Sequence, residues 1–316
     1  MSTPSRYVDL PSRAAYGKAL TDLAEKNDRI VALSADLAAS TGLKEFTEKY
    51  PDRFFNIGIA EQNMYGIAAG MALSGKIPFA STFATFASLR AAEQVRTDIA
   101  YGNVPVRVVG THQGVGLAPA GPTHHALEDI GVMRCLANMT IINPADSTQA
   151  AMATAALVDF AGPAYLRLSR PKEATVYTEE TPFVIGKADI VRDGKDISII
   201  ACGGMVGQSL LAAELLATEG IQAQVINMST IKPIDKDAII AGAEATGAIL
   251  TVEEHNIFGG LGSAVAEVIA EAGLGIRFLR WGIQDIYTKT GEYPELLKLY
   301  ELDGDGIAAK AKSLLA

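Results

Sequence analysis

The stretch Phe55-Asn56-Ile57-Gly58-Ile59-Ala60-Glu61-Gln62-Asn63-Met64 decides how the chain folds. A short apolar run ends at Asn56, and apolar residues then recur at helical spacing from Ala60 to about Ser74, which predicts a strand, a turn and a helix. Glycine and alanine dominate that helix, so it can pack closely against another helix or another chain. We therefore expect a buried helix that carries Glu61 in its first turn.

Glu61 is open to two interpretations. An acidic residue in the first turn of a helix interacts favourably with the helix dipole. A carboxyl group taken out of water can instead share a proton with a nitrogen atom of a ligand, because burial disfavours its charged form. Both roles fit this stretch taken alone.

Short apolar segments alternate with helical patterns along the rest of the chain, which is typical of α/β domains with parallel sheets. In the first half we expect strands at 29–34, 53–56, 77–81, 104–110, 139–143 and 165–168, and helices at 12–27, 43–50, 60–74, 86–99 and 147–158. In the second half we expect strands at 188–191, 197–201, 223–227, 248–253 and 276–281, and helices at 205–218, 235–243, 262–272 and from 294 onward. A polar, charged segment at 169–182 separates the halves. We predict two α/β domains, 1–172 and 186–316, joined by a linker at 173–185.

Composition narrows the class of protein. The formal net charge is -9 and the pI about 5.0, which argues against general attraction to nucleic acid or to an anionic membrane. No apolar run reaches the length of a membrane span, and residues 1–10 lack the apolar core of a leader peptide. Cys135 and Cys202 show no metal-binding spacing, as expected for reduced thiols in the cytoplasm.

Polar and aromatic residues follow the ends of the first-half strands, at Asp36, 56–61, 82–86, 111–125 and 167–170. Ligands of open parallel sheets bind at the carboxyl ends of strands, so we expect a site at this edge. Phe83 and Phe86 either form a wall for a flat heterocycle or belong to the core.

The segment 111–125, which we call the histidine loop, is rich in glycine and proline and contains His112, His124 and His125. Metal binding is one interpretation, but no further ligand stands at a standard spacing, so we predict no metal ligands in this chain. Neutral imidazoles suit hydrogen bonding and proton transfer to a polyol better. A purely structural role is the third interpretation.

Two arginines belong to the same edge. Arg13 is in the first turn of the first helix and Arg170 follows a strand, and the planar fork of either can bind a substrate phosphate or a surface carboxylate. In the second domain, Gly259-Gly260-Leu261-Gly262-Ser263 opens a helix. These glycines either cradle a phosphate or allow close helix packing.

Together the motifs resemble the transketolase family. The resemblance is carried by Ser34-Ala35-Asp36-Leu37, Ile57-Gly58-Ile59-Ala60-Glu61, Ser81-Thr82-Phe83, Gly121-Pro122-Thr123-His124, Val252-Glu253-Glu254-His255 and Gly259-Gly260-Leu261-Gly262. It covers nearly the whole chain, but only the carboxyl-terminal half of a full-length transketolase. It implies a pyrimidine-binding domain of the thiamine-diphosphate-binding fold, followed by a smaller α/β transketolase C-terminal domain.

The resemblance also implies a split enzyme. In transketolases an amino-terminal domain, with a Gly-Asp-Gly motif and a downstream Asn, holds the diphosphate of thiamine diphosphate and its Mg²⁺. This sequence has no counterpart of that domain, so a separate amino-terminal subunit would supply those ligands. The family implies a heterotetramer with two copies of each chain, acting on sugar phosphates.

Individual roles follow from the same resemblance. Glu61 hydrogen-bonds to N1′ of the aminopyrimidine of the cofactor and, with His112 and His124, forms the implied catalytic set. The implied cofactor-binding residues are Asp36, Glu61, Phe83 and Phe86. The implied substrate-binding residues are Arg13, Ser40, His112, His124 and Arg170. The two histidines would contact the sugar hydroxyls or the enamine intermediate, and the other three the terminal phosphate.

Three departures from the family pattern stand out. Pro119-Ala120 replaces a Glu-Asp pair whose acidic side chain normally accepts a hydrogen bond from the hydroxyl beside the reacting carbon. Leu89 replaces an aromatic residue that some members place beside the pyrimidine. Residues 285–291 replace the more usual Phe-Gly-x-Ser-Gly-type sequence. Because a methyl group cannot accept that hydrogen bond, we expect a branched, deoxy or otherwise modified sugar phosphate.

Three functions are consistent with these residues. The first is a thiamine-diphosphate-dependent transferase of two-carbon ketol units. The second is the β subunit of the E1 component of a 2-oxoacid dehydrogenase, and the third is a non-catalytic regulatory subunit.

Overall fold

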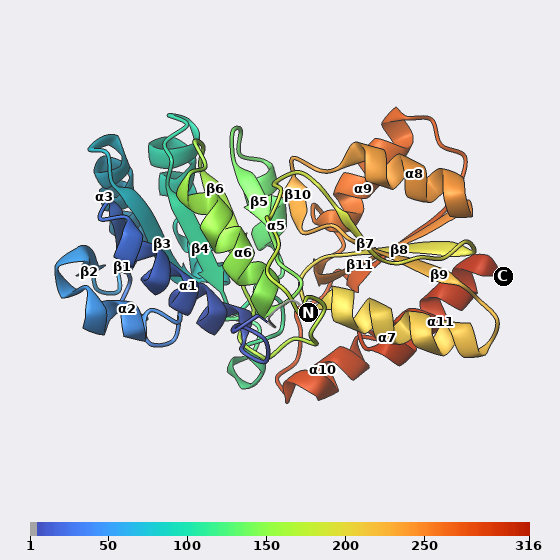
Figure 1. Cartoon of the computed structure of the whole chain (residues 1–316). Coiled ribbons are helices and arrows are strands. Elements are labelled where there is room, and N and C mark those ends of the chain that lie inside the picture. The colour runs from blue at the N-terminus through green and yellow to red at the C-terminus, as the bar shows by residue number, and fades with distance from the viewer. Residues whose placement is uncertain (1–4) are drawn as a thin grey trace.

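The computed structural model describes residues 5–316, so the first four positions of the predicted domain 1–172 lie outside the described residues. Over this range the strands form a seven-stranded and a five-stranded sheet (Figure 1). The first sheet has the order β10 (Thr230–Lys232), β5 (Thr140–Ile142), β6 (Ala164–Arg167), β4 (Arg107–Thr111), β3 (Ile77–Phe83), β1 (Ile30–Ser34) and β2 (Phe54–Asn56). The second has the order β12 (Arg277–Ile283), β11 (Ala248–Asn256), β8 (Ile197–Ala201), β9 (Ala223–Asn227) and β7 (Asp189–Arg192).

The predicted α/β fold class is confirmed, with one correction at the sheet edges. β7 pairs antiparallel with β9, and β10 pairs antiparallel with β5. The expectation of parallel pairing is therefore wrong for β7, which corresponds to the strand expected at 188–191. The sequence pattern does not predict β10, because Ile231 is its single apolar residue and Pro233 follows the strand directly. β10 comes from the second half of the chain, yet it completes the sheet of the first half.

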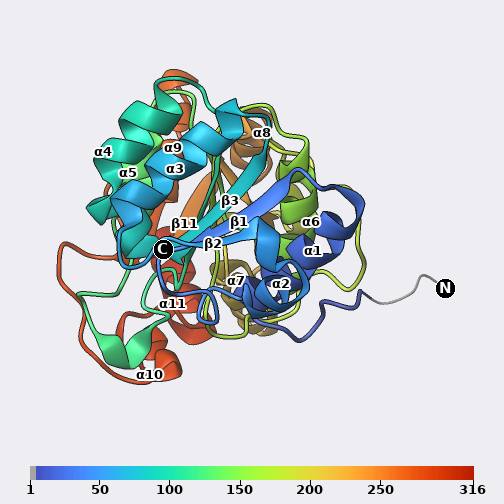
Figure 2. The ribbon, with the colours of Figure 1, turned by 90° about the vertical axis from the view of Figure 1, so that its left-hand side faces the viewer.

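Helices cover both faces of each sheet (Figures 1 and 2). On the first sheet, one face carries α1 (Ser12–Lys26), α2 (Lys44–Lys49) and α6 (Ser147–Val158), and the other carries α3 (Glu61–Leu73), α4 (Ala92–Gln94) and α5 (Asp129–Arg134). On the second sheet, α8 (Lys236–Thr246) and α9 (Leu261–Glu271) lie opposite α7 (Met205–Thr218) and α11 (Gly304–Leu315), and α10 (Tyr293–Leu299) lies at the end nearer the first domain.

The predicted helix 86–99 is divided into three shorter helices. The π-helices η2 (Phe86–Arg90) and η3 (Val95–Ala100) flank α4. Short 3₁₀ turns, η1 (Pro51–Arg53) and η4 (Ala118–Ala120), lie in connecting segments. Single-turn π-helical segments occur frequently at functional sites, and η2 begins three residues after the end of β3.

Local sequence explains the most regular elements. β1 and β3 are apolar or small-residue runs and are buried along their whole lengths, as expected for central strands covered on both faces. Asp146 caps the start of α6. Its Oδ1 accepts a hydrogen bond from the Gln149 N–H at 2.9 Å, as is usual at an N-cap. Its Oδ2 accepts from the N–H groups of Val176 and Tyr177, both at 2.7 Å. The predicted linker is therefore attached to the first domain.

A buried ion pair lies where the two domains meet. Arg167, at the end of β6, is 1% exposed and forms two contacts with Asp129, from Nε at 2.7 Å and from Nη2 at 3.0 Å. Nη2 also donates to the carbonyl oxygen of Glu254 in β11 at 3.0 Å. The apolar core is likewise shared, because one cluster of buried residues includes Met64 of α3 and Val265 of α9.

Candidate functional site

Five neighbouring strands of the first sheet end at the same edge. They follow the order β2, β1, β3, β4 and β6 and are mutually parallel. The register pairs Ser34 with Asn56 and Phe83 with Thr111. Candidate residues that are far apart in the sequence therefore meet along one edge of the sheet.

Glu61 is the first residue of α3, and its side chain is only 2% exposed. Nη1 of Arg90 lies 2.9 Å from Glu61 Oε1. The same guanidinium lies over the ring of Phe86, 4.0 Å from the ring centroid. The buried carboxylate is thus joined to an aromatic surface through one arginine.

Four aromatic side chains form a continuous ring cluster, which we define as Phe83, Phe86, His112 and His124. The centroids of Phe83 and Phe86 are 5.6 Å apart at an interplanar angle of 26°. His112 lies 4.1 Å from Phe83, and His124 lies 5.4 Å from Phe86. Because Phe86 and His124 are only half-buried, the ring cluster presents a partly open aromatic wall.

His112 has a defined hydrogen-bonding state. Its Nδ1 lies 2.9 Å from Thr111 Oγ1, and that hydroxyl donates to the Thr82 carbonyl oxygen at 3.3 Å. A hydroxyl has one proton, so this network assigns the imidazole proton to Nδ1 and leaves Nε2 as an acceptor. Burial and the positive charges of Arg13 and Arg170 lower the pKa of His112 to about 3. The ring is therefore neutral at neutral pH.

Arg13 and Arg170 make this part of the edge strongly positive. Arg13 Nη1 donates to the carbonyl oxygen of Ser40 at 2.6 Å, and its buried Nε has no hydrogen-bond partner within residues 5–316. Burial and the charge of the exposed Arg170 lower the pKa of Arg13. Two like charges and an unused donor favour an anion at this position. Ser40 contributes its carbonyl group here.

Asp36 holds the turn that leads to α3. It is exposed and has a left-handed φ of 60°. Its N–H donates to Asn56 Oδ1, and its Oδ1 accepts from Asn56 Nδ2, both at 3.0 Å. Asn56 Oδ1 also accepts from the Gly58 N–H at 3.2 Å. Contact between Asp36 and a cofactor stays a prediction.

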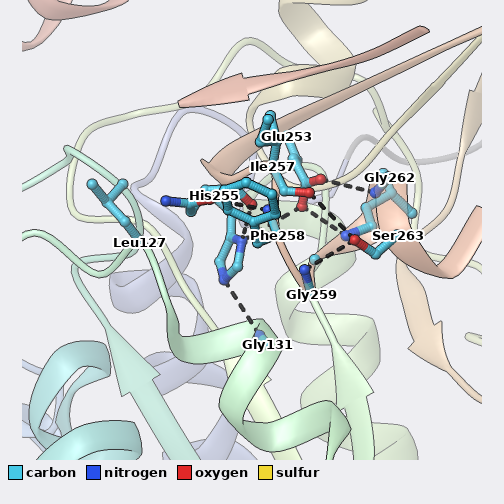
Figure 3. Close-up of polar contacts among 12 residues, drawn as sticks. Leu127, Gly131, Glu253, His255, Ile257, Phe258, Gly259, Gly262 and Ser263 are labelled. Atoms are coloured by element: carbon cyan, nitrogen blue, oxygen red, sulfur yellow. Dashed lines mark hydrogen bonds and ion pairs between the residues drawn. The ribbon is translucent and has the colours of Figure 1, made fainter. Parts of the chain in front are cut away.

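The glycine-rich segment before α9 is occupied by a side chain of this protein (Figure 3). Glu253 Oε2 accepts from the Leu261 N–H at 2.6 Å, and Oε1 accepts from the Gly262 N–H at 2.8 Å. A Cβ atom on Gly260 would collide with the same carboxyl group. Because Glu253 takes the position that a phosphate would need, these glycines serve helix capping and packing.

The sequence does contain one Gly-Asp-Gly triplet, Gly304-Asp305-Gly306, which has the same residues as the diphosphate-binding motif of transketolases. Residues 307–316 contain no asparagine. The triplet forms the first turn of α11, where Asp303 Oδ1 accepts from the Gly306 N–H at 3.0 Å. A Cβ atom on Gly306 would collide with the backbone of Glu301. This triplet is therefore the start of a packed helix.

The sequence patterns did not single out three residues of the candidate site, which are Arg90, Thr111 and Thr123. Arg90 stands one helical turn after Phe86, a spacing that could have indicated a side-chain contact. Thr123 Oγ1 lies 2.9 Å from His124 Nδ1, the same distance as in the Thr111–His112 pair. The repeated Thr-His dipeptide in the histidine loop was the available signal.

Within residues 5–316, no group of three or more His, Cys, Asp or Glu side chains could hold a metal ion. Over the same range, none of the helices has the length and apolar character needed to cross a bilayer. Both cysteines are free thiols, Cys135 exposed and Cys202 buried.

Comparison with known proteins identifies the family. The model of the transketolase pyrimidine-binding domain matches residues 9–174, and that of the transketolase C-terminal domain matches residues 186–307. A 6-deoxy-6-sulfo-D-fructose transketolase subunit, SqwH, of a Clostridium species is 42% identical over 279 residues, 88% of this chain and 86% of that one. A subunit of the apulose-4-phosphate transketolase of Phocaeicola vulgatus is 40% identical over 300 residues, 95% of this chain and 96% of that one.

A solved structure agrees with these relatives. It is described as a split gene transketolase in the form of an inactive β4 tetramer. Its chain superimposes with a TM-score of 0.88 at 42% identity, covering 97% of this chain and 98% of that one.

Proposed function

Because this chain belongs to the transketolase family, we propose that it is the pyrimidine-side subunit of a two-chain, thiamine-diphosphate-dependent transketolase. The reaction moves a two-carbon ketol unit from a ketose phosphate to an aldose phosphate. The observation that carries the proposal is the buried Glu61 carboxylate beside the partly open aromatic wall of the ring cluster.

The side chains around Glu61 suit an aminopyrimidine. That group is flat and carries a ring nitrogen, and an aromatic wall next to a buried carboxyl group matches both features. Phe83, Phe86 and Glu61 would hold it. When bound, thiamine diphosphate supplies the nucleophilic carbon and the electron sink that ketol transfer needs. The diphosphate and Mg²⁺ would be bound by the partner subunit.

Residues of this chain have distinct parts in the proposed reaction. Glu61 would hydrogen-bond to N1′ of the aminopyrimidine, and its burial would strengthen that hydrogen bond. His112 is neutral with Nε2 free to accept, so it can accept a hydrogen bond from a sugar hydroxyl. His124 stands on the open side of the ring cluster and contacts the same sugar.

The positive site at Arg13 would bind the terminal anion of the substrate. The unpartnered Nε of Arg13 and the nearby charge of Arg170 support this assignment. A phosphate and a sulfonate both present three oxygens to such a site. Both kinds of sugar are therefore candidates for the assay, together with the branched and deoxy sugar phosphates.

Ala120 points to a modified sugar. It lies in the histidine loop, is exposed, and provides no acceptor for a hydroxyl group. We expect Ala120→Asp to raise kcat/KM for common ketose phosphates about tenfold or more relative to the natural substrate. An unchanged ratio of the two kcat/KM values would remove Ala120 from the account of specificity.

The decisive test is Glu61→Gln in the complex with the amino-terminal subunit. We expect kcat to fall about 100-fold or more, because proton transfer by a positioned group contributes at least that factor. Glu93→Gln changes an exposed carboxyl group of α4 and is the matched control. Turnover by Glu61→Gln close to that of the wild type would reject the mechanism.

The assay also separates the alternatives. Ketol transfer from ketose phosphates supports the proposal, whereas reaction with pyruvate-type acids and a lipoyl acceptor would identify an E1 β subunit. If adding the partner produces neither turnover nor cofactor binding, the chain is a regulatory subunit.

Assembly, domain limits and location complete the proposal. The solved relative described as an inactive β4 tetramer supports an active form that also contains the amino-terminal subunit, and we propose a heterotetramer. The division into 1–172, 173–185 and 186–316 stays a proposal, as does location in the cytoplasm. Light scattering of the reconstituted complex and cell fractionation test the first and last of these.

A further inference from the structure

The second half of the chain contacts both ends of the histidine loop. The loop closes where Gly114 and Ala126 form an antiparallel bridge. Just inside this bridge, the Val115 N–H donates to Glu254 Oε1 at 2.7 Å. Gly114 has a φ of 57°, and a Cβ atom there would collide with the Glu254 carboxyl group. A side chain of β11 therefore fixes the beginning of the loop.

His125 fixes the end of the loop. It is 2% exposed, with Nε2 at 3.1 Å from the Ala118 carbonyl oxygen and Nδ1 at 2.6 Å from Thr288 Oγ1. A carbonyl oxygen only accepts, so the ring proton is on Nε2 and the Thr288 hydroxyl donates to Nδ1. Burial lowers the pKa of His125, which agrees with this neutral state.

Thr288 is the buried member of an exposed segment. It lies between β12 and α10, and it is 3% exposed whereas residues 284–287, 289 and 290 are exposed. A Cβ atom on Gly121 would collide with the side chain of Thr290. The segment therefore lies directly against the histidine loop, and its buried Thr288 side chain contacts His125 of that loop.

We infer that Thr288 is a positioning residue for the active site, acting through His125 to keep the adjacent His124 in place on the ring cluster. The inference rests on the proposed function, because it assigns the second domain a part in holding the sugar. His124 directly precedes His125 in the sequence, and its ring centroid lies 5.4 Å from that of Phe86 and 6.4 Å from that of Phe83. Glu61 pairs with Arg90, whereas Thr288 bonds to His125, so the two side chains have different partners.

The test uses Thr288→Val, which keeps the shape of the side chain but removes the hydroxyl. In the complex with the partner subunit we expect kcat/KM for the ketose substrate to fall about tenfold or more, because small displacements of positioned groups cost rate steeply. The thiamine diphosphate concentration that gives half-maximal activity should change less than about twofold. Thr288→Ser keeps the donor and should restore kcat/KM.

Lys232→Met is the control for general loosening between the domains. Lys232 Nζ donates to the carbonyl oxygens of Arg134 and Leu136 at 2.9 and 2.6 Å, away from the histidine loop. We expect near-normal kinetics in this variant. If Lys232→Met reproduces the loss, or if Thr288→Val retains wild-type kcat/KM, the inference is overturned.

A second measurement needs no activity. Hydrogen–deuterium exchange of the full chain should be faster at 111–127 in Thr288→Val, and close to wild type in Thr288→Ser and Lys232→Met. If the wild-type complex transfers no ketol unit, the proposed function fails, and unchanged exchange in Thr288→Val would separately refute the inference. Should Thr288→Val not fold, Thr288→Ala removes the same hydroxyl without adding bulk.

Discussion

Replacing Glu254 by Gln should remove a pH-dependent cost from the folded state. Glu254 is buried, with Val115 N–H donating to Oε1 at 2.7 Å and the Tyr293 hydroxyl donating to Oε2 at 3.0 Å. Burial, only partly offset by the positive charge of Arg167, raises the pKa of Glu254 from 4.5 to about 7. A carboxyl group with a raised pKa stabilises the fold fully below its unfolded pKa, and that stabilisation is lost as the pH rises through its folded pKa.

The size of the effect follows from the two pKa values. They differ by about 2.5, from 7 minus 4.5, and each unit corresponds to about 1.36 kcal/mol, so the full effect is roughly 3 kcal/mol. Most of it falls between pH 5 and pH 8.5. Over that interval the wild type should lose roughly 2–3 kcal/mol more stability than Glu254→Gln.

Urea unfolding can measure this difference. The single tryptophan, Trp281, lies in β12 next to the strand of Glu254. Its fluorescence therefore reports on the unfolding of the second domain, which contains Glu254. Glu214→Gln, an exposed change on α7, should follow the wild type at every pH. If Glu254→Gln loses as much stability as the wild type between pH 5 and pH 8.5, the assigned burial cost is wrong.

Three further outcomes are expected. Arg90→Lys loses the planar contact over its neighbouring ring, so thiamine diphosphate should bind roughly threefold to tenfold more weakly in a fluorescence titration. Arg167→Met leaves Asp129 as an unpaired buried charge and should lower the unfolding free energy by about 3–5 kcal/mol. Under native conditions a maleimide should modify the exposed Cys135 only, since Cys202 is buried and its pKa is raised by that burial; equal labelling of both would contradict the fold.

Most regular elements were predictable because their patterns are local. The apolar run of β1 and the small-residue helix α3 with Glu61 in its first turn both appear in the sequence. β10 and α5 were not predictable, since β10 contains a single apolar residue and Gly131 interrupts the short α5. Both elements depend on the strands and helices around them.

The candidate site was predictable in composition and less so in its contacts. Residues at strand ends could be assigned to one edge because parallel strands end together. The pairing of Glu61 with Arg90 depends on the relation of α3 to η2, which no spacing encodes. The contact between His125 and Thr288 joins positions 163 residues apart, so it required the folded chain.

The crossing of β10 into the first sheet restricts how this protein can be recombined. A gene cut within the linker would separate β10 from β5 and leave β5 as an unpaired edge, which favours aggregation. A chimera with a homologue therefore has to keep Thr230–Lys232 together with the first half. Alternatively, the homologue has to supply a strand that pairs with β5 in the same register. The two halves are therefore one structural unit, although the protein has two sheets.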